Sequence, residues 1–99
     1  MPRIRVIKFR IIWLYEYHGV DLLNVIGDNI RFLRESRGYS QEGLAIRAGL
    51  QRTYIGDVER GERNITVLNL EHIAEALQIH PSVLLMDDVF RWKGRGSRK

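Results

Sequence analysis

The chain has 99 residues and carries 16 lysines and arginines against 12 acids, for a net charge of +4; this length is typical of one small domain. It has no cysteine, which excludes disulfides and thiolate metal sites. The longest apolar runs are too short to span a membrane or to form the core of a signal peptide, and we expect a cytoplasmic protein.

A first helix is predicted to begin after Asp21, whose side chain can cap it, and Gly38 can end it in the left-handed conformation. Its apolar residues recur at helical spacing and form one face: Leu22, Ile26, Ile30 and Leu33. Ser40 can cap a second helix, which Gly49 ends. A third helix is predicted from about residue 51 to residue 59.

Two further helices are predicted after a turn near Gly61. Thr66 can cap the fourth, and its apolar residues follow at helical spacing: Leu70, Ile73, Ala74 and Leu77. Pro81 suits the first position of a fifth helix. Five short helices joined by tight turns describe an all-α domain over residues 21–90.

The two ends are expected to lie outside this domain. Residues 1–20 form a basic and apolar arm, and its segment 3–13 fits a strand by composition and a helix by spacing. We favour a strand or an irregular arm. Residues 91–99 are expected to be a basic, flexible tail.

Positive charge is unevenly distributed along the chain. Residues 1–10 and 91–99 contain no acid, and the other seven arginines all lie in the segment 31–63. The span 64–90 has four acids and no lysine or arginine. This distribution favours a molecule with one side that binds an anion, such as a nucleic acid.

The segment 41–58 has the features of two helices that cross at a tight turn. Ala45 is small where the two backbones approach, and Gly49 tolerates the positive φ that the turn requires. The packed face is formed by apolar residues of both helices: Leu44, Ala48, Leu50, Ile55 and Val58. Small, glycine and branched residues at these mutual spacings together indicate a helix-turn-helix.

The opposite face of the predicted helix at 51–59 is short or polar. On a helical wheel it contains Thr53, Gly56, Asp57 and Arg60, with Arg52 at the flank. Such a face can approach base edges in the groove of a duplex.

Residues 27–86 resemble the phage-repressor/Cro-like (XRE) helix-turn-helix family. The resemblance rests on NIRFLRESRGYSQEGLA and on AGLQRTYIGDVERGERNITVLNLEHIAEAL. Within the second segment, residues 52–66 are most similar to controller proteins of restriction–modification systems. The resemblance implies a lambda-repressor-like domain that binds palindromic operators in double-stranded DNA as a homodimer and regulates transcription.

The resemblance also implies contacts with DNA for particular residues. Base edges would be contacted by Arg52, Thr53 and Arg63, with a phosphate as the alternative for Thr53 and Arg63. Arg52 and Thr53 could also be ordinary exposed surface residues. The DNA backbone would be contacted by Gln41, Tyr54 and Asn64, with base edges as the alternative for Tyr54 and Asn64 and core packing as a further alternative for Tyr54.

Four charged side chains complete the expected site. Asp57 either accepts a hydrogen bond from a cytosine amino group or orients Arg60 or Arg52. Arg60 is expected at the DNA backbone. In the family, the acid at Glu59 pairs with the arginine at Arg34, and breaking such a pair costs several kcal/mol when it is half-buried.

Two glycines depart from the family pattern. Gly43 stands where an acid is usual, which leaves the capping box begun by Ser40 incomplete. Gly56 stands where serine is usual, at a helix-propensity cost of roughly 1 kcal/mol. It either permits close approach to a groove or is tolerated drift.

The C-terminal part of the domain has more apolar residues than the edge of one small domain needs: Val83, Leu84, Leu85, Met86, Val89 and Phe90. They form either a dimer interface or the closure of the monomer core. We favour the interface because a two-fold protein matches palindromic DNA.

A protein-interaction module, such as an antitoxin, is the alternative function. In that case the arm at residues 1–20 would be the binding segment. No catalytic constellation or metal-ligand spacing stands out, so we expect no enzyme, no cofactor, no metal and no small-molecule ligand.

Overall fold

The computed structural model describes residues 21–87, and these residues are all-α. The predicted arm, the tail, Val89 and Phe90 lie outside the described residues. Within that range the elements are α2 (Leu22–Ser36), α3 (Gln41–Ala48), α4 (Arg52–Glu59), α5 (Val67–Leu77) and the 3-10 helix η1 (Pro81–Leu85). The expectation of a fifth α-helix at Pro81 is therefore corrected to a 3-10 helix of five residues. None of the described helices is long and apolar enough to cross a bilayer.

Three α-helices begin at the polar caps that the sequence predicts. The side chains of Asp21, Ser40 and Thr66 each accept a hydrogen bond from the backbone N–H three residues later, at 3.4, 2.9 and 3.0 Å. These bonds satisfy amides that the first turn of a helix leaves without partners. At the start of α4, Gln51 makes no such side-chain bond.

The helix ends fix the directions of the connecting turns. Gly38 has φ +73° after α2, and Gly49 has φ +70° at the end of α3. Glycine adopts this conformation at little steric cost, so the chain reverses sharply after each helix. At the end of α5, Gln78 has φ +61°, a left-handed conformation at a residue with a side chain.

The core lies between the four α-helices and η1. Its largest fully buried apolar side chains come from every element: Ile30, Leu44, Ile55, Ile73, Leu77 and Leu84. Leu84 was expected in a dimer interface, but it has no exposed surface in the single chain. It closes the monomer core instead, because the turn of η1 directs it between α2 and α5.

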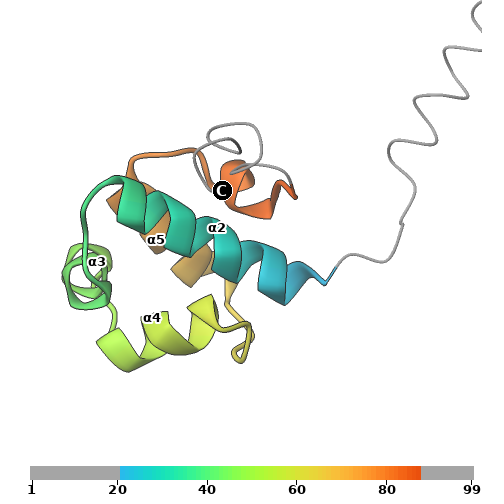
Figure 1. Cartoon of the computed structure of the whole chain (residues 1–99), viewed down its shortest axis with the longest axis horizontal. Helices are drawn as coiled ribbons and strands as arrows, with labels where there is room; N and C mark the ends of the chain where they lie inside the picture. The colour runs from blue at the N-terminus through green and yellow to red at the C-terminus, as the bar shows by residue number, and fades with distance from the viewer. Residues whose placement is uncertain (1–20, 88–99) are drawn as a thin grey trace, which may run out of the picture.

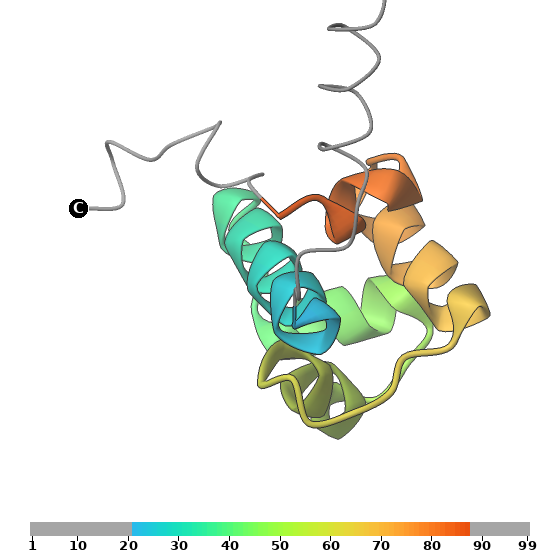
Figure 2. The same cartoon turned by 90° about the vertical axis from the view of Figure 1, so that its right-hand side faces the viewer.

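The helices α4 and η1 lie on opposite sides of the molecule. Figure 1 shows α2 crossing the molecule with α4 below it and η1 above it, and Figure 2 shows the same separation after a quarter turn. The helix α2 contacts both of them. It is therefore the element that fixes the two ends relative to each other.

The backbones of α2 and α4 approach closely at Gly27. A Cβ at this position would lie 2.5 Å from the carbonyl oxygen of Val58 and 2.6 Å from that of Glu59. Real Cβ atoms do not come so close to backbone oxygens. Gly27 is therefore needed for the distance between α2 and α4.

Candidate nucleic-acid interface

The helix α4 is docked by its apolar side and turns its polar side outward. Ile55 and Val58 are buried, whereas Arg52 and Thr53 are exposed. In the loop that follows α4, Arg63 and Asn64 are also exposed. These four residues expected to contact DNA are thus exposed on or beside α4, whereas Gln41, Tyr54 and Asp57 are only partly exposed.

A buried ion pair joins α4 to α2. Arg34 donates from Nε to Oε2 of Glu59 at 2.6 Å and from Nη2 to Oε1 at 3.0 Å. Its Nη1 donates to the carbonyl oxygen of Tyr39 at 2.9 Å. The hydrogen bond with Glu59 raises the pKa of Arg34. This two-pronged geometry fixes the end of α4 against α2, with the two side chains only 10% and 4% exposed.

The buried pair continues to the surface through Gln41. The side-chain amide of Gln41 donates to Oε1 of Glu59 at 3.0 Å, and its oxygen accepts from Nη1 of Arg52 at 3.3 Å. We call Arg34, Glu59, Gln41 and Arg52 the Gln41 network. The side chain of Gln41, expected at a phosphate, therefore holds Arg52. Its backbone N–H, at the first position of α3, has no partner within the helix.

A second set of charges surrounds Asp57. This carboxylate accepts from Nη2 of Arg60 at 2.5 Å and from Nη1 of Arg63 at 3.4 Å. Glu62 accepts from Nε of Arg60 at 3.0 Å, and this bond raises the pKa of Arg60. We call Asp57, Arg60, Glu62 and Arg63 the Asp57 network. Asp57 was expected to orient Arg60 or Arg52 if it did not bind a base. In the structure it contacts Arg60 and Arg63, whereas Arg52 contacts Gln41.

Tyr54 is half-buried and packs against the core. Its hydroxyl accepts a hydrogen bond from Nδ2 of Asn69 at 3.1 Å. The guanidinium carbon of Arg63 lies 4.9 Å from the centre of the Tyr54 ring, close enough for a cation–π contact. Tyr54 thus connects the core to Arg63, a role that sequence reasoning did not assign to it.

Asn29 fixes the opposite end of the molecule. This fully buried side chain donates from Nδ2 to the carbonyl oxygens of Leu84 and Met86, at 2.9 and 2.7 Å. Sequence reasoning missed it, although a polar residue on the apolar face of the first predicted helix was a signal. Of the expected dimer residues, Val83 packs half-buried on the core, whereas Leu85 and Met86 are 43% and 46% exposed.

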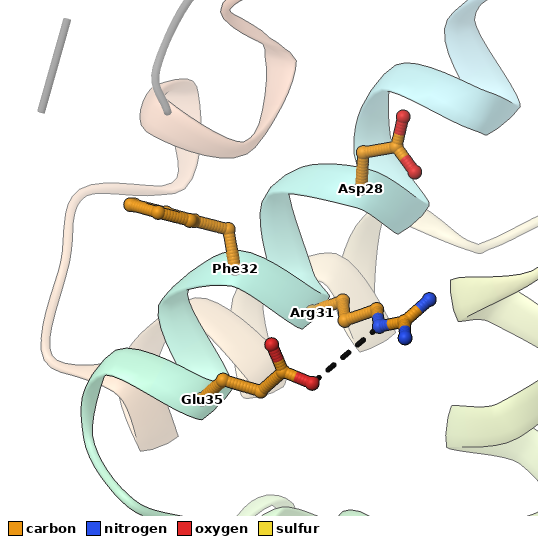
Figure 3. A pocket seen from close by; sticks show the side chains of 4 residues that line it. All are labelled: Asp28, Arg31, Phe32 and Glu35. Atoms are coloured by element: carbon orange, nitrogen blue, oxygen red, sulfur yellow. Dashed lines mark hydrogen bonds and ion pairs between the residues drawn. The ribbon is translucent and has the colours of Figure 1, made fainter. Parts of the chain in front are cut away.

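A pocket of 230 Å³ lies on the outside of α2 (Figure 3). Its described lining residues all belong to that helix: Asp28, Arg31, Phe32 and Glu35. Arg31 and Glu35 pair at 3.5 Å, with both side chains more than half exposed, and such surface pairs contribute little stability. We assign no binding role to this pocket.

A helix-turn-helix with a firmly docked second helix and arginines on its outer side defines the class of proteins that place a helix in the major groove of DNA. The chain belongs to the helix-turn-helix family, whose model matches residues 30–84, more than half of the chain.

Within that family, the chain is similar to restriction–modification controller proteins. The control protein C.BamHI of Bacillus amyloliquefaciens is 45% identical over 62 residues, which cover 62% of this chain and 76% of the relative. The crystal structure of the controller protein C.AhdI from Aeromonas hydrophila has 47% identity and a TM-score of 0.62, with 63% of this chain and 94% of that chain covered. The controller protein C.Esp1396I, solved as a tetramer in complex with its natural 35 base-pair operator, has 36% identity and a TM-score of 0.61, with 67% and 87% covered.

Proposed function

We propose that this protein is a sequence-specific, DNA-binding transcriptional regulator in the cytoplasm, and that it works as a restriction–modification controller protein without catalytic activity. The observation that carries the proposal is the docking of α4. Ile55, Val58 and the buried Arg34–Glu59 pair hold this helix, while Arg52 and Thr53 remain exposed. The similar control proteins support the same function.

In this proposal, base selection and general affinity come from different side chains. Arg52 and Thr53, at the start of α4, contact base edges, and the fork of an arginine suits the acceptor pair of guanine. Arg63 lies over Tyr54 and beside Asp57, so it contacts a base or phosphate from a fixed position. Arg60 and Asn64 contact the DNA backbone and supply affinity that falls with salt.

The proposal includes a homodimer on a palindromic operator. Leu85 and Met86 are exposed apolar residues held at the end of η1 by Asn29. Two neighbouring exposed apolar side chains favour contact with a second copy. We place the domain at residues 21–90, and we include Val89 and Phe90 in the dimer interface.

The regulator is preferred to the protein-interaction module. The similar controller protein C.Esp1396I was solved in complex with its operator, which favours a protein that binds DNA.

Selection of duplexes from a random pool by the purified full chain tests the proposal. We expect enrichment of one inverted repeat, together with a mass of two chains in sedimentation. Enrichment of a site without symmetry, or a single chain in solution, would contradict the homodimer. A pool with no enriched sequence would contradict sequence-specific binding itself.

Replacing Arg52 tests the assignment of base contacts. Arg52→Ala should relax selection at one base position per half-site, at about 1–3 kcal/mol for the preferred base. Competition binding against a set of single-base operator variants measures this effect. As a control, Arg47→Ala removes an equal charge from α3 and should lower affinity alike for all duplexes. Equal losses for all duplexes with Arg52→Ala would assign this residue to the backbone.

A further inference from the structure

The helices α2 and α4 each contain an interior glycine, and the two glycines have different surroundings. A Cβ at Gly27 would meet backbone oxygens, so helix packing explains that residue. The three atoms nearest to a Cβ at Gly56 are side-chain ends: Nη1 of Arg60 at 3.3 Å, and the amide atoms of Gln41 at 3.6 and 3.9 Å. Since glycine is unfavourable inside a helix, Gly56 calls for an explanation other than backbone contact.

The side chain of Arg60 is 56% exposed and lies across Gly56, with two acids as partners. Its Nε donates to Glu62 and its Nη2 donates to Asp57. The third guanidinium nitrogen, Nη1, is the atom nearest to the place where a Cβ would stand. Gly56 itself is buried although its helix is at the surface, because Arg60 and Gln41 lie against it.

A side chain at position 56 would displace Arg60. A separation of 3.3 Å is tighter than ordinary Cβ contacts, so the guanidinium would have to move by a few tenths of an ångström. That movement acts on a group already held by two carboxylates, one of them at 2.5 Å. The orientation of Nη1 relative to the outer face of α4 would therefore change.

We propose that Gly56 is a positioning residue for DNA recognition, and that its missing side chain lets Arg60 lie flat on α4 with Nη1 directed to a hydrogen-bond acceptor of the duplex. This inference rests on the proposed function. It replaces the two open explanations of Gly56, close approach to a groove or drift, with a specific role. The acceptor is a phosphate oxygen or a guanine edge. Losing a phosphate contact weakens binding to all duplexes alike, whereas losing a guanine contact weakens binding only to duplexes with guanine at that position.

The first test compares Gly56→Ala with Gly43→Ala. Both changes replace a helical glycine with a better helix former. Both also place a Cβ close to a side-chain end: 3.2 Å from Oγ of Ser40 at Gly43 on α3, and 3.3 Å from Nη1 of Arg60 at Gly56. We expect both variants to be folded and to unfold cooperatively on heating. Only Gly56→Ala should weaken binding to the selected operator, by about tenfold, which is the scale of one lost hydrogen bond.

The second test asks whether Gly56 acts through Arg60. In an Arg60→Ala background, Gly56→Ala should change the operator affinity less than about twofold, because residues that act through one contact are not additive. Low salt keeps the weakened complexes measurable. A uniform loss over operator variants identifies a phosphate as the acceptor, and a loss at one position identifies a base edge.

Two results would overturn the positioning role: an unchanged operator affinity in Gly56→Ala, or the same tenfold loss in the Arg60→Ala background. Both leave the proposed function intact as long as the wild type still selects a site. If the wild type enriches no sequence, the proposed function fails, and the role of Gly56 in DNA recognition fails with it.

Discussion

The two ends of the molecule are attached to α2 by two buried polar side chains of different kinds. At one end, the charged Arg34 binds Glu59 of α4 through two hydrogen bonds. At the other end, the neutral Asn29 binds the carbonyl oxygens of Leu84 and Met86. One helix thus positions both the candidate DNA-binding face and the exposed apolar residues of the proposed dimer interface.

The difference between the two attachments lies in how completely their polar atoms are paired. The guanidinium of Arg34 and both carboxylate oxygens of Glu59 have partners. The Oδ1 of Asn29 has no hydrogen-bond partner within residues 21–87. Removing one member of a buried ion pair leaves an uncompensated charge, whereas removing the asparagine leaves only neutral carbonyls. The attachment of α4 is therefore the more costly one to break.

Arg34→Ala should produce the largest effect, because it leaves the carboxylate of Glu59 buried without its main partner. We expect a loss of about 3–5 kcal/mol in the free energy of unfolding, measured by urea denaturation. The matched control is Arg31→Ala, which removes an exposed arginine one turn earlier on α2 and should cost less than about 0.5 kcal/mol. Similar losses in the two variants would refute the structural role of the buried pair.

Asn29→Ala should have an intermediate effect. Loss of its bonds to the carbonyl oxygens of Leu84 and Met86 should lower the free energy of unfolding by about 1–3 kcal/mol. Dimerisation, followed by sedimentation at several protein concentrations, should weaken as well. The control Asn24→Ala removes an exposed asparagine from the same helix. If Asn29→Ala dimerises as strongly as the wild type, η1 is not part of the dimer interface.

Gln41→Ala should have the smallest effect on stability, about 0.5–1.5 kcal/mol, because Arg34 still pairs with Glu59. Arg52 loses the acceptor that holds it, so its base preference should relax in part. Selection at the base contacted by Arg52 measures this change. Gln51→Ala serves as the control, since Gln51 makes no capping bond with its side chain. Equal selectivity in both variants would count against the Gln41 network.

The elements that follow from short-range chemistry were predictable from the sequence. A cap depends on a side chain and an amide three residues later, so Asp21, Ser40 and Thr66 were assigned correctly. The same holds for Gly49, where only the local φ matters. The inward direction of Ile55 and Val58 follows from the helical period.

The features that depend on distant residues were not predictable. Asn29 is separated by 55 residues from Leu84, whose carbonyl it binds, and no local pattern reveals that pairing. The 3-10 helix after Pro81 and the burial of Leu84 occur where this part of the chain packs against Asn29 of α2, so they too depend on distant residues. At the site, the hydrogen bond between Gln41 and Arg52 joins two helices, so the sequence predicted both residues but not their relation.

The close contact at Gly27 has a consequence for how such a protein can change over evolutionary time. Because backbone atoms set the distance between α2 and α4 there, the place of α4 does not depend on the side chains of its outer face. Exchanges at Arg52 or Thr53 alter the chemistry offered to a groove and leave the scaffold in place. A lineage built on this fold can therefore acquire a new target sequence by one or two surface substitutions, without repair of its core.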